Sequence, residues 1–128
     1  MTPALTELRA LLERVEGATD RLLSADDSNM LWDITDGYGA GDDGRYDTTI
    51  DAAVAFSQAV LPGWMIVEMG QDPLHGLWFC CLYNIDTKTA AESSELDTLS
   101  SAIIAATLRA MIAESEVKNA ESEVKNAE

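Results

Sequence analysis

The sequence has few residues of the kinds that build catalytic and metal centres. It contains one histidine, His75, and two cysteines, Cys80 and Cys81. Adjacent residues of a strand point to opposite faces, so these cysteines are poorly placed for a disulfide with each other, and we expect buried thiols. No nucleophile motif or zinc-ligand spacing surrounds His75. The sequence therefore predicts a protein that is not an enzyme and that has no cofactor and no metal site.

Basic residues are also scarce. Lys and Arg total 8 against 23 Asp and Glu, which gives a formal net charge of -15 at pH 7. A charge of this size repels phosphate backbones and anionic lipids, so direct binding to nucleic acid or to a membrane is disfavoured. The same charge attracts basic surfaces. A basic nucleic-acid-binding protein of the host is therefore the expected partner.

Long apolar runs are missing as well. No stretch approaches the ~18 apolar residues of a transmembrane helix, and residues 1–4 lack the layout of a signal peptide, so we expect a cytoplasmic protein. Apolar residues nevertheless make up 47% of the 128 residues. That is enough for one hydrophobic core, and a single folded domain is predicted.

Apolar spacing predicts helices near the N-terminus and in the middle of the chain. Leucines and a valine recur at helical spacing over residues 3–16, until Gly17. A second helical face begins near Ile50, with Thr48 as the expected cap, and ends at Pro62-Gly63. Between them, residues 28–35 predict a short element, followed by a long Gly-rich and Asp-rich loop.

The middle of the chain predicts two antiparallel strands, over residues 64–69 and 77–85, joined by a turn. The second run is apolar on both faces, which indicates a central strand covered on each side. A final helix, expected to be capped by Ser94, is apolar almost all round in its first half, so that half belongs in the core. The predicted fold is α+β, with a small antiparallel sheet sandwiched between helices and a long C-terminal helix.

The end of the chain repeats the heptad AESEVKN twice, over residues 113–119 and 120–126. Ala and Val recur at coiled-coil spacing, but such a seam is weak and two repeats are few. We divide the chain into a domain over residues 1–112 and a heptad-repeat helical extension over residues 113–128. A solvated helix is favoured for the extension, and a homodimer formed through it is the alternative.

Four segments, in order, resemble the phage ABA sandwich domain family. They are LLERVEGAT (11–19), YDTTIDAA (46–53), LPGW (61–64) and the closing helix around LRA (108–110). The resemblance covers most of residues 4–112, and it implies a phage or prophage origin and a sheet between helices, without an activity. The chain departs from the family in the stretch 36–47 and in the heptad tail, and insertions on a shared scaffold often carry a specific function.

Acidic residues concentrate between positions 22 and 60, where eight Asp face a single basic residue, Arg45. Their spacing fits neither a calcium-binding EF-hand loop nor a phosphate-binding loop. Two interpretations remain: a solubilising loop, or a carboxylate surface that imitates the phosphates of a duplex. On the second interpretation the partner-binding residues are Asp26, Asp27, Asp33, Asp36, Asp42, Asp43 and Asp47.

These observations predict a phage-encoded, non-enzymatic inhibitor of a bacterial defence system. It would resemble an anti-CRISPR protein, whose acidic surface blocks a basic groove of a Cas effector or a similar host protein. One alternative is a protein that sequesters a small nucleotide-like signalling molecule in an aromatic-lined cleft. Another is a structural phage protein that assembles through its terminal helix.

Overall fold

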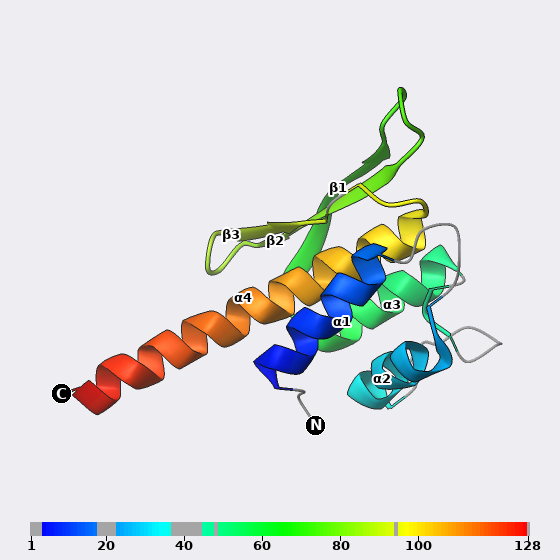
Figure 1. Cartoon of the computed structure of the whole chain (residues 1–128). Coiled ribbons are helices and arrows are strands. Elements are labelled where there is room, and N and C mark those ends of the chain that lie inside the picture. The colour runs from blue at the N-terminus through cyan, green and yellow to red at the C-terminus, as the bar shows by residue number, and fades with distance from the viewer. Residues whose placement is uncertain (1–3, 18–22, 37–44, 48, 94, 128) are drawn as a thin grey trace.

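The computed structural model describes residues 4–17, 23–36, 45–47, 49–93 and 95–127, with residues 119–127 described by their backbone alone. In this part of the chain, helices and one antiparallel sheet form an α+β fold (Figure 1). The predicted class, the antiparallel sheet and the long final helix are confirmed. In chain order the elements are α1 (Leu5–Gly17), α2 (Ala25–Thr35), α3 (Ile50–Val60), β1 (Trp64–Gln71), β2 (Trp78–Asn84), β3 (Thr89–Glu92) and α4 (Leu99–Ala127).

Side-chain caps set where three of the helices begin. The Ser24 hydroxyl accepts a hydrogen bond from the backbone N–H of Asp27 and caps α2. Thr49 caps α3, and Thr98 accepts from the backbone N–H of Ser101 at the start of α4. These caps each satisfy a backbone donor that a helix N-terminus would otherwise leave unpaired. The helices therefore begin at caps other than the ones expected at Thr48 and Ser94, which lie outside the described residues.

A tight turn leads from α3 into the sheet. Pro62 and Gly63 occupy its centre, and the backbone N–H of Trp64 donates to the carbonyl of Leu61 at 3.2 Å. Gly63 has a φ of 92°, which suits the third position of a type II turn and is strained for any residue with a Cβ. The Pro-Gly pair therefore fixes the direction in which β1 enters the sheet.

The sheet has the strand order β1-β2-β3, with both neighbours antiparallel. Strand β2 is central, as its apolar sequence predicts. A bulge interrupts the β1–β2 register between Ile66 and Glu68. Strand β3, of sequence TAAE, was not predicted, because Ala and Glu are weak strand formers and only pairing with β2 holds it.

The first half of α4 is the centre of the core, as predicted. All its residues from 102 to 108 are buried, including Thr107, whose hydroxyl donates to the carbonyl of Ile103. Contacts with β2 and β3 on one side and with α1 and α3 on the other enclose this half of the helix. A helix surrounded in this way must be apolar around its whole circumference.

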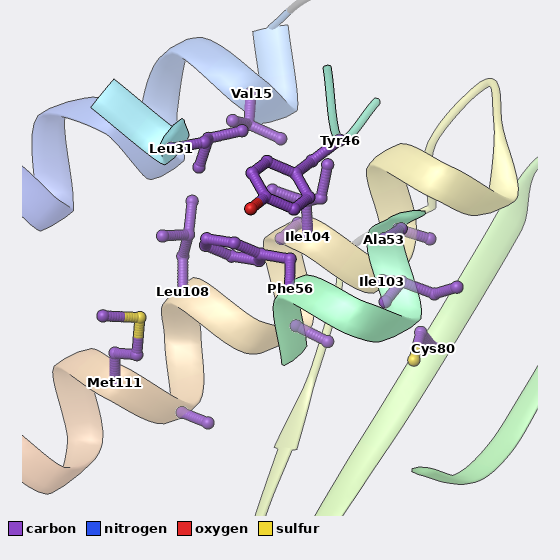
Figure 2. Close-up of a cluster of buried hydrophobic side chains, with 14 of the residues drawn as sticks. Val15, Leu31, Tyr46, Ala53, Phe56, Cys80, Ile103, Ile104, Leu108 and Met111 are labelled. Atoms are coloured by element: carbon purple, nitrogen blue, oxygen red, sulfur yellow. The ribbon is translucent and has the colours of Figure 1, made fainter. Parts of the chain in front are cut away.

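An aromatic pair anchors the side of the core away from the sheet. The rings of Tyr46 and Phe56 lie with centroids 5.3 Å apart and planes inclined at 50°. They are surrounded by apolar side chains from α1, α2 and α4, among them Val15, Leu31 and Leu108 (Figure 2). The Tyr46 hydroxyl forms a hydrogen bond with Thr35 at the end of α2, so the buried phenol keeps a polar partner.

The sheet lies against α4 by one face, and the helices gather on that side (Figure 1). Cys80 and Leu82 of β2 point toward α4 and are fully buried. The alternate residues of β2 are half-buried, and their neighbour Met65 on β1 is exposed. Among the described helices, none covers this outer face. The predicted second layer of helices, which would place the sheet between two layers, is therefore not seen among these residues. In the described part of the chain, no helix combines the length and apolarity needed to span a membrane.

Candidate functional site

Three of the acidic residues predicted to bind a partner are exposed along α2. Asp26 and Asp33 are seven residues apart, which is close to two helical turns, so they lie on one side of the helix about 10 Å apart along its axis. Asp36 follows at the C-cap, with a left-handed φ of 54°. We call Asp26, Asp33 and Asp36 the acidic stripe.

The acidic stripe belongs to a helix that has no basic side chain of its own. Helix α2 contains no Lys or Arg, and it lies at the edge of the molecule, where it packs on α3 (Figure 1). Trp32, also exposed, lies on the same helix. One DNA strand carries a phosphate for about every 3.4 Å of duplex axis, so two carboxylates about 10 Å apart are roughly one third as dense along their own axis. The stripe is thus less densely charged than a DNA strand.

Two other predicted acids have roles inside the fold. The Asp27 side chain is 10% exposed and accepts a hydrogen bond from Arg14 at 2.7 Å. The Asp47 side chain is 2% exposed, accepts from the backbone N–H of Leu23 at 2.8 Å and pairs with Arg45 at 3.0 Å. Buried carboxylates need such partners, because an unpaired buried charge is costly. Asp27 and Asp47 are therefore withdrawn from the predicted binding surface.

The remaining two predicted acids, Asp42 and Asp43, lie outside the described residues. Most of the stretch that departs from the apparent family, residues 37–44, lies outside them too. Its predicted role as an acidic surface stays a prediction.

Arginine side chains in the described part of the chain bind carboxylates of the same chain. Each such pair joins segments that are separate in sequence or braces a loop. The pairs are Arg9–Glu116 at 2.5 Å, Arg14–Asp27 at 2.7 Å, Arg45–Asp47 at 3.0 Å and Arg109–Glu16 at 2.7 Å. The four described arginines therefore pair with acids of the chain's own structure, and none of these pairs involves Asp26, Asp33 or Asp36.

A pocket of about 420 Å³ lies between the start of β1, the β2–β3 turn and the second half of α4. Trp64, Val117 and Lys118 are among its lining residues. The Trp64 indole donates from Nε1 to the Glu114 carboxylate at 2.7 Å, which holds the ring against α4. The lining supplies one aromatic ring and one cation, with the Glu114 carboxylate beside them, so its charges are balanced and the ring is its main feature for a small ligand.

Cys80 is a core thiol, whereas Cys81 is half-buried on the outer face of β2, so the expected burial is confirmed for Cys80 alone. Burial raises the pKa of the Cys80 thiol to about 12, and the neighbouring Cys81 adds to the shift. Burial also raises the pKa of Cys81, with smaller contributions from Glu92 and Glu68. A reactive cysteine needs a lowered pKa. Neither environment favours a nucleophilic thiolate, although only Cys80 is a core residue as predicted.

One group of potential metal ligands was not predicted from the sequence. At the β1–β2 turn, the Asp72 carboxylate lies 2.7 Å from Nδ1 of His75, and Glu95 supplies a third potential ligand atom, all within 4.8 Å of one another. The hydrogen bond to Asp72 raises the pKa of His75 and lowers that of Asp72. The Asp-x-x-His spacing was visible in the sequence, whereas the approach of Glu95, twenty positions beyond His75, required the fold.

Searches of protein-family models, of curated proteins and of solved structures found no match to this chain. The resemblance to the phage ABA sandwich domain family stays a prediction that rests on the sequence segments alone.

Proposed function

We propose that the protein is a phage-encoded, non-enzymatic inhibitor that competes with nucleic acid for a basic groove of a host defence protein, such as a Cas effector. The observation that carries the proposal is the acidic stripe: two exposed carboxylates on one side of a peripheral helix that has no basic residue, and a third at its C-cap. The net charge of -15 supports it, because the long-range field favours encounter with a basic surface over binding to nucleic acid.

The two buried carboxylates reduce the number of residues that can bind the partner. Asp27 and Asp47 stabilise the fold, so they are not available to a partner. Among the described residues, the proposed partner-binding surface therefore consists of Asp26, Asp33 and Asp36. Because exposed charges act through a screened field, the affinity for a basic partner should fall steeply with ionic strength.

A phage plaque assay tests this function directly. Bacteria that carry an active CRISPR system against a phage are given the protein, and restored plaque formation reports inhibition. The triple variant D26N/D33N/D36N should lose most of the inhibition, because it removes the acidic stripe. The matched control is E7Q/E13Q/D86N, which removes the same charge from exposed positions on α1 and in the β2–β3 turn.

The two triple variants separate a local surface from general acidity. If both variants lose inhibition equally, the total charge matters and the stripe does not. If the wild-type protein restores no plaques against representative CRISPR systems, the proposed target class is wrong. Circular dichroism of each variant establishes that it is folded.

The pocket supports a second candidate function, sequestration of a small nucleotide-like signalling molecule. Its volume of about 420 Å³ is within the range of small-molecule sites, and Trp64 and Lys118 lie on its wall. Calorimetry against a panel of cyclic nucleotides tests this function. Binding that K118M weakens and that D26N/D33N/D36N leaves unchanged would favour sequestration over competition with nucleic acid.

A further inference from the structure

The turn between β1 and β2 holds a histidine in a fixed position. The turn is closed by two backbone hydrogen bonds, from Asp72 N–H to Leu77 at 2.7 Å and from Gly76 N–H to Asp72 at 2.8 Å. One carboxylate oxygen of Asp72 accepts from the backbone N–H of Leu74 at 2.8 Å, and the other lies 2.7 Å from Nδ1 of His75. The carboxylate is therefore oriented by the turn, and it orients the imidazole.

A distant segment supplies a third side chain. Trp78, the first residue of β2, exchanges two backbone hydrogen bonds with Leu96, at 2.6 and 2.8 Å. This isolated bridge holds the segment before α4 beside the hairpin, and it brings Glu95 within reach of the turn. Among the described residues, none donates a hydrogen bond or forms an ion pair with the Glu95 carboxylate.

The distances suit a single metal ion. One ligand atom from each of Asp72, His75 and Glu95 lies within 4.8 Å of the other two. Nitrogen and oxygen ligands about 2.0–2.2 Å from one ion lie about 3–4 Å apart, so side-chain shifts below about 1 Å would complete the arrangement. The His75 side chain is 66% exposed and Glu95 is also exposed, so both can make such shifts.

We propose that Asp72, His75 and Glu95 bind one divalent transition-metal ion, with water completing its coordination. One imidazole nitrogen and two carboxylate oxygens suit Zn²⁺, Co²⁺ or Mn²⁺, whereas Ca²⁺ prefers oxygen ligands alone and more of them. The ion would join the β1–β2 hairpin to the segment that leads into α4. This site replaces the expectation from sequence that the chain has no metal site, and it lies outside the acidic stripe, so it stands independently of the proposed function.

The competing interpretation is an Asp72–His75 pair that only closes the turn. Such a pair accounts for the orientation of His75, and in it Glu95 acts only through the charge of a protonated imidazole, without binding an ion. Two carboxylates repel each other, and either a protonated His75, whose pKa both carboxylates raise, or a bound metal ion can balance them. The two interpretations differ in what they predict for Glu95.

Calorimetric titration of the untagged, full-length chain with Zn²⁺ tests the proposal. We expect one binding site per chain, with the affinity lowered about tenfold or more in both H75A and E95Q. The matched control is D86N, which removes the same charge as E95Q from an exposed position in the other hairpin turn and should bind within about twofold of wild type. Melting curves in the presence of a chelator show whether each variant is folded.

Co²⁺ absorption identifies the ligands. Nitrogen and oxygen ligands give weak visible bands, whereas a thiolate ligand adds a strong near-ultraviolet band, which would assign the metal to Cys81. The proposal is overturned by that thiolate band, by H75A binding Zn²⁺ as tightly as wild type, or by a Kd weaker than about 1 mM. If E95Q alone binds like wild type, the ion is held by the turn and the three-residue site is wrong.

Discussion

The guanidinium of Arg14 on α1 donates from Nε to the Asp27 carboxylate on α2, across a distance of 2.7 Å. Asp27 is mostly buried, whereas Arg14 is half-exposed. This bond joins the helix at the edge of the molecule, which carries the acidic stripe, to the helix that packs on α4. The position of the acidic stripe therefore depends on Asp27, a carboxylate that is not part of the stripe.

Replacing Asp27 should destabilise the protein more than replacing an acid of the stripe. For D27N we expect a loss of about 1–2 kcal/mol in the free energy of unfolding, because a charge-assisted hydrogen bond in a partly buried position is lost. For D33N, which changes an exposed position on the same helix, the change should stay below about 0.5 kcal/mol. Urea denaturation measures both values, and equal losses would contradict an internal role for Asp27.

Asp47 should be more sensitive still. D47A removes the acceptor for the Leu23 N–H and leaves Arg45, which is itself mostly buried, without its carboxylate. Breaking a buried pair from one side costs about 3–5 kcal/mol, and the partial exposure of Arg45 reduces this to about 2–4 kcal/mol. A shift of the urea midpoint gives the value. A loss below about 1 kcal/mol would show that water replaces the carboxylate.

These two acids mark the limit of what the sequence can predict. The spacing of apolar residues predicted α1, α3 and the two paired strands. In these elements the residues that pack on the core recur at a helical or strand spacing. A carboxylate has no such signature. Asp26 and Asp27 are neighbours in the chain, yet one is exposed and the other binds Arg14. Which face of α2 meets α1 is decided by packing between helices, and Leu23 meets Asp47 across 24 residues of chain.

The same reasoning explains the other differences between prediction and structure. Strand β3 has an Ala-rich sequence and forms because it pairs with β2. Its own sequence therefore does not predict a strand. Glu95 joins Asp72 and His75 only because the Trp78–Leu96 bridge forms. Contacts between segments that are distant in the chain depend on the assembled fold, and a single sequence does not record them.

Alkaline pH should destabilise the protein through Cys80. Its pKa is raised from 9.0 to about 12 by burial, so between these values the unfolded chain releases a proton that the folded chain retains. The thiol therefore contributes stability that is present below about pH 9 and is lost as the pH rises toward about 12. We expect the melting temperature to fall more steeply from pH 8 to pH 10 in the wild type than in C80A.

The quantity compared between wild type and C80A is the slope of the melting temperature against pH, and not the absolute stability. Removing a buried thiol lowers stability at every pH, and that constant cost cancels when the two slopes are compared. All other ionisable groups are present in both proteins. Parallel slopes would show that Cys80 gains access to solvent in the folded state, and rapid alkylation of Cys80 at pH 8 would support the same conclusion.

The last prediction concerns the boundary between the domain and its helical extension. Helix α4 runs through residue 112 without a break, and Glu114 accepts the Trp64 indole hydrogen bond at 2.7 Å beyond it. Glu116 pairs with Arg9, but both side chains are about half exposed, so this pair contributes little. A chain that ends after residue 112 should therefore be about 1–2 kcal/mol less stable than one that ends after residue 118, chiefly through the loss of the Trp64–Glu114 bond.

Point variants at Glu114 separate this bond from the loss of helix length. E114A should lower the free energy of unfolding by about 1 kcal/mol, whereas E114Q retains an oxygen that can accept from Trp64 and should lower it less. Thermal denaturation of the two truncated chains and the two variants gives all four values. If the chains ending at 112 and 118 are equally stable, residues 113–118 are an independent extension, as the heptad repeat predicts. If the shorter chain is weaker and E114A accounts for most of the difference, the domain includes the first heptad, and the extension begins after Lys118.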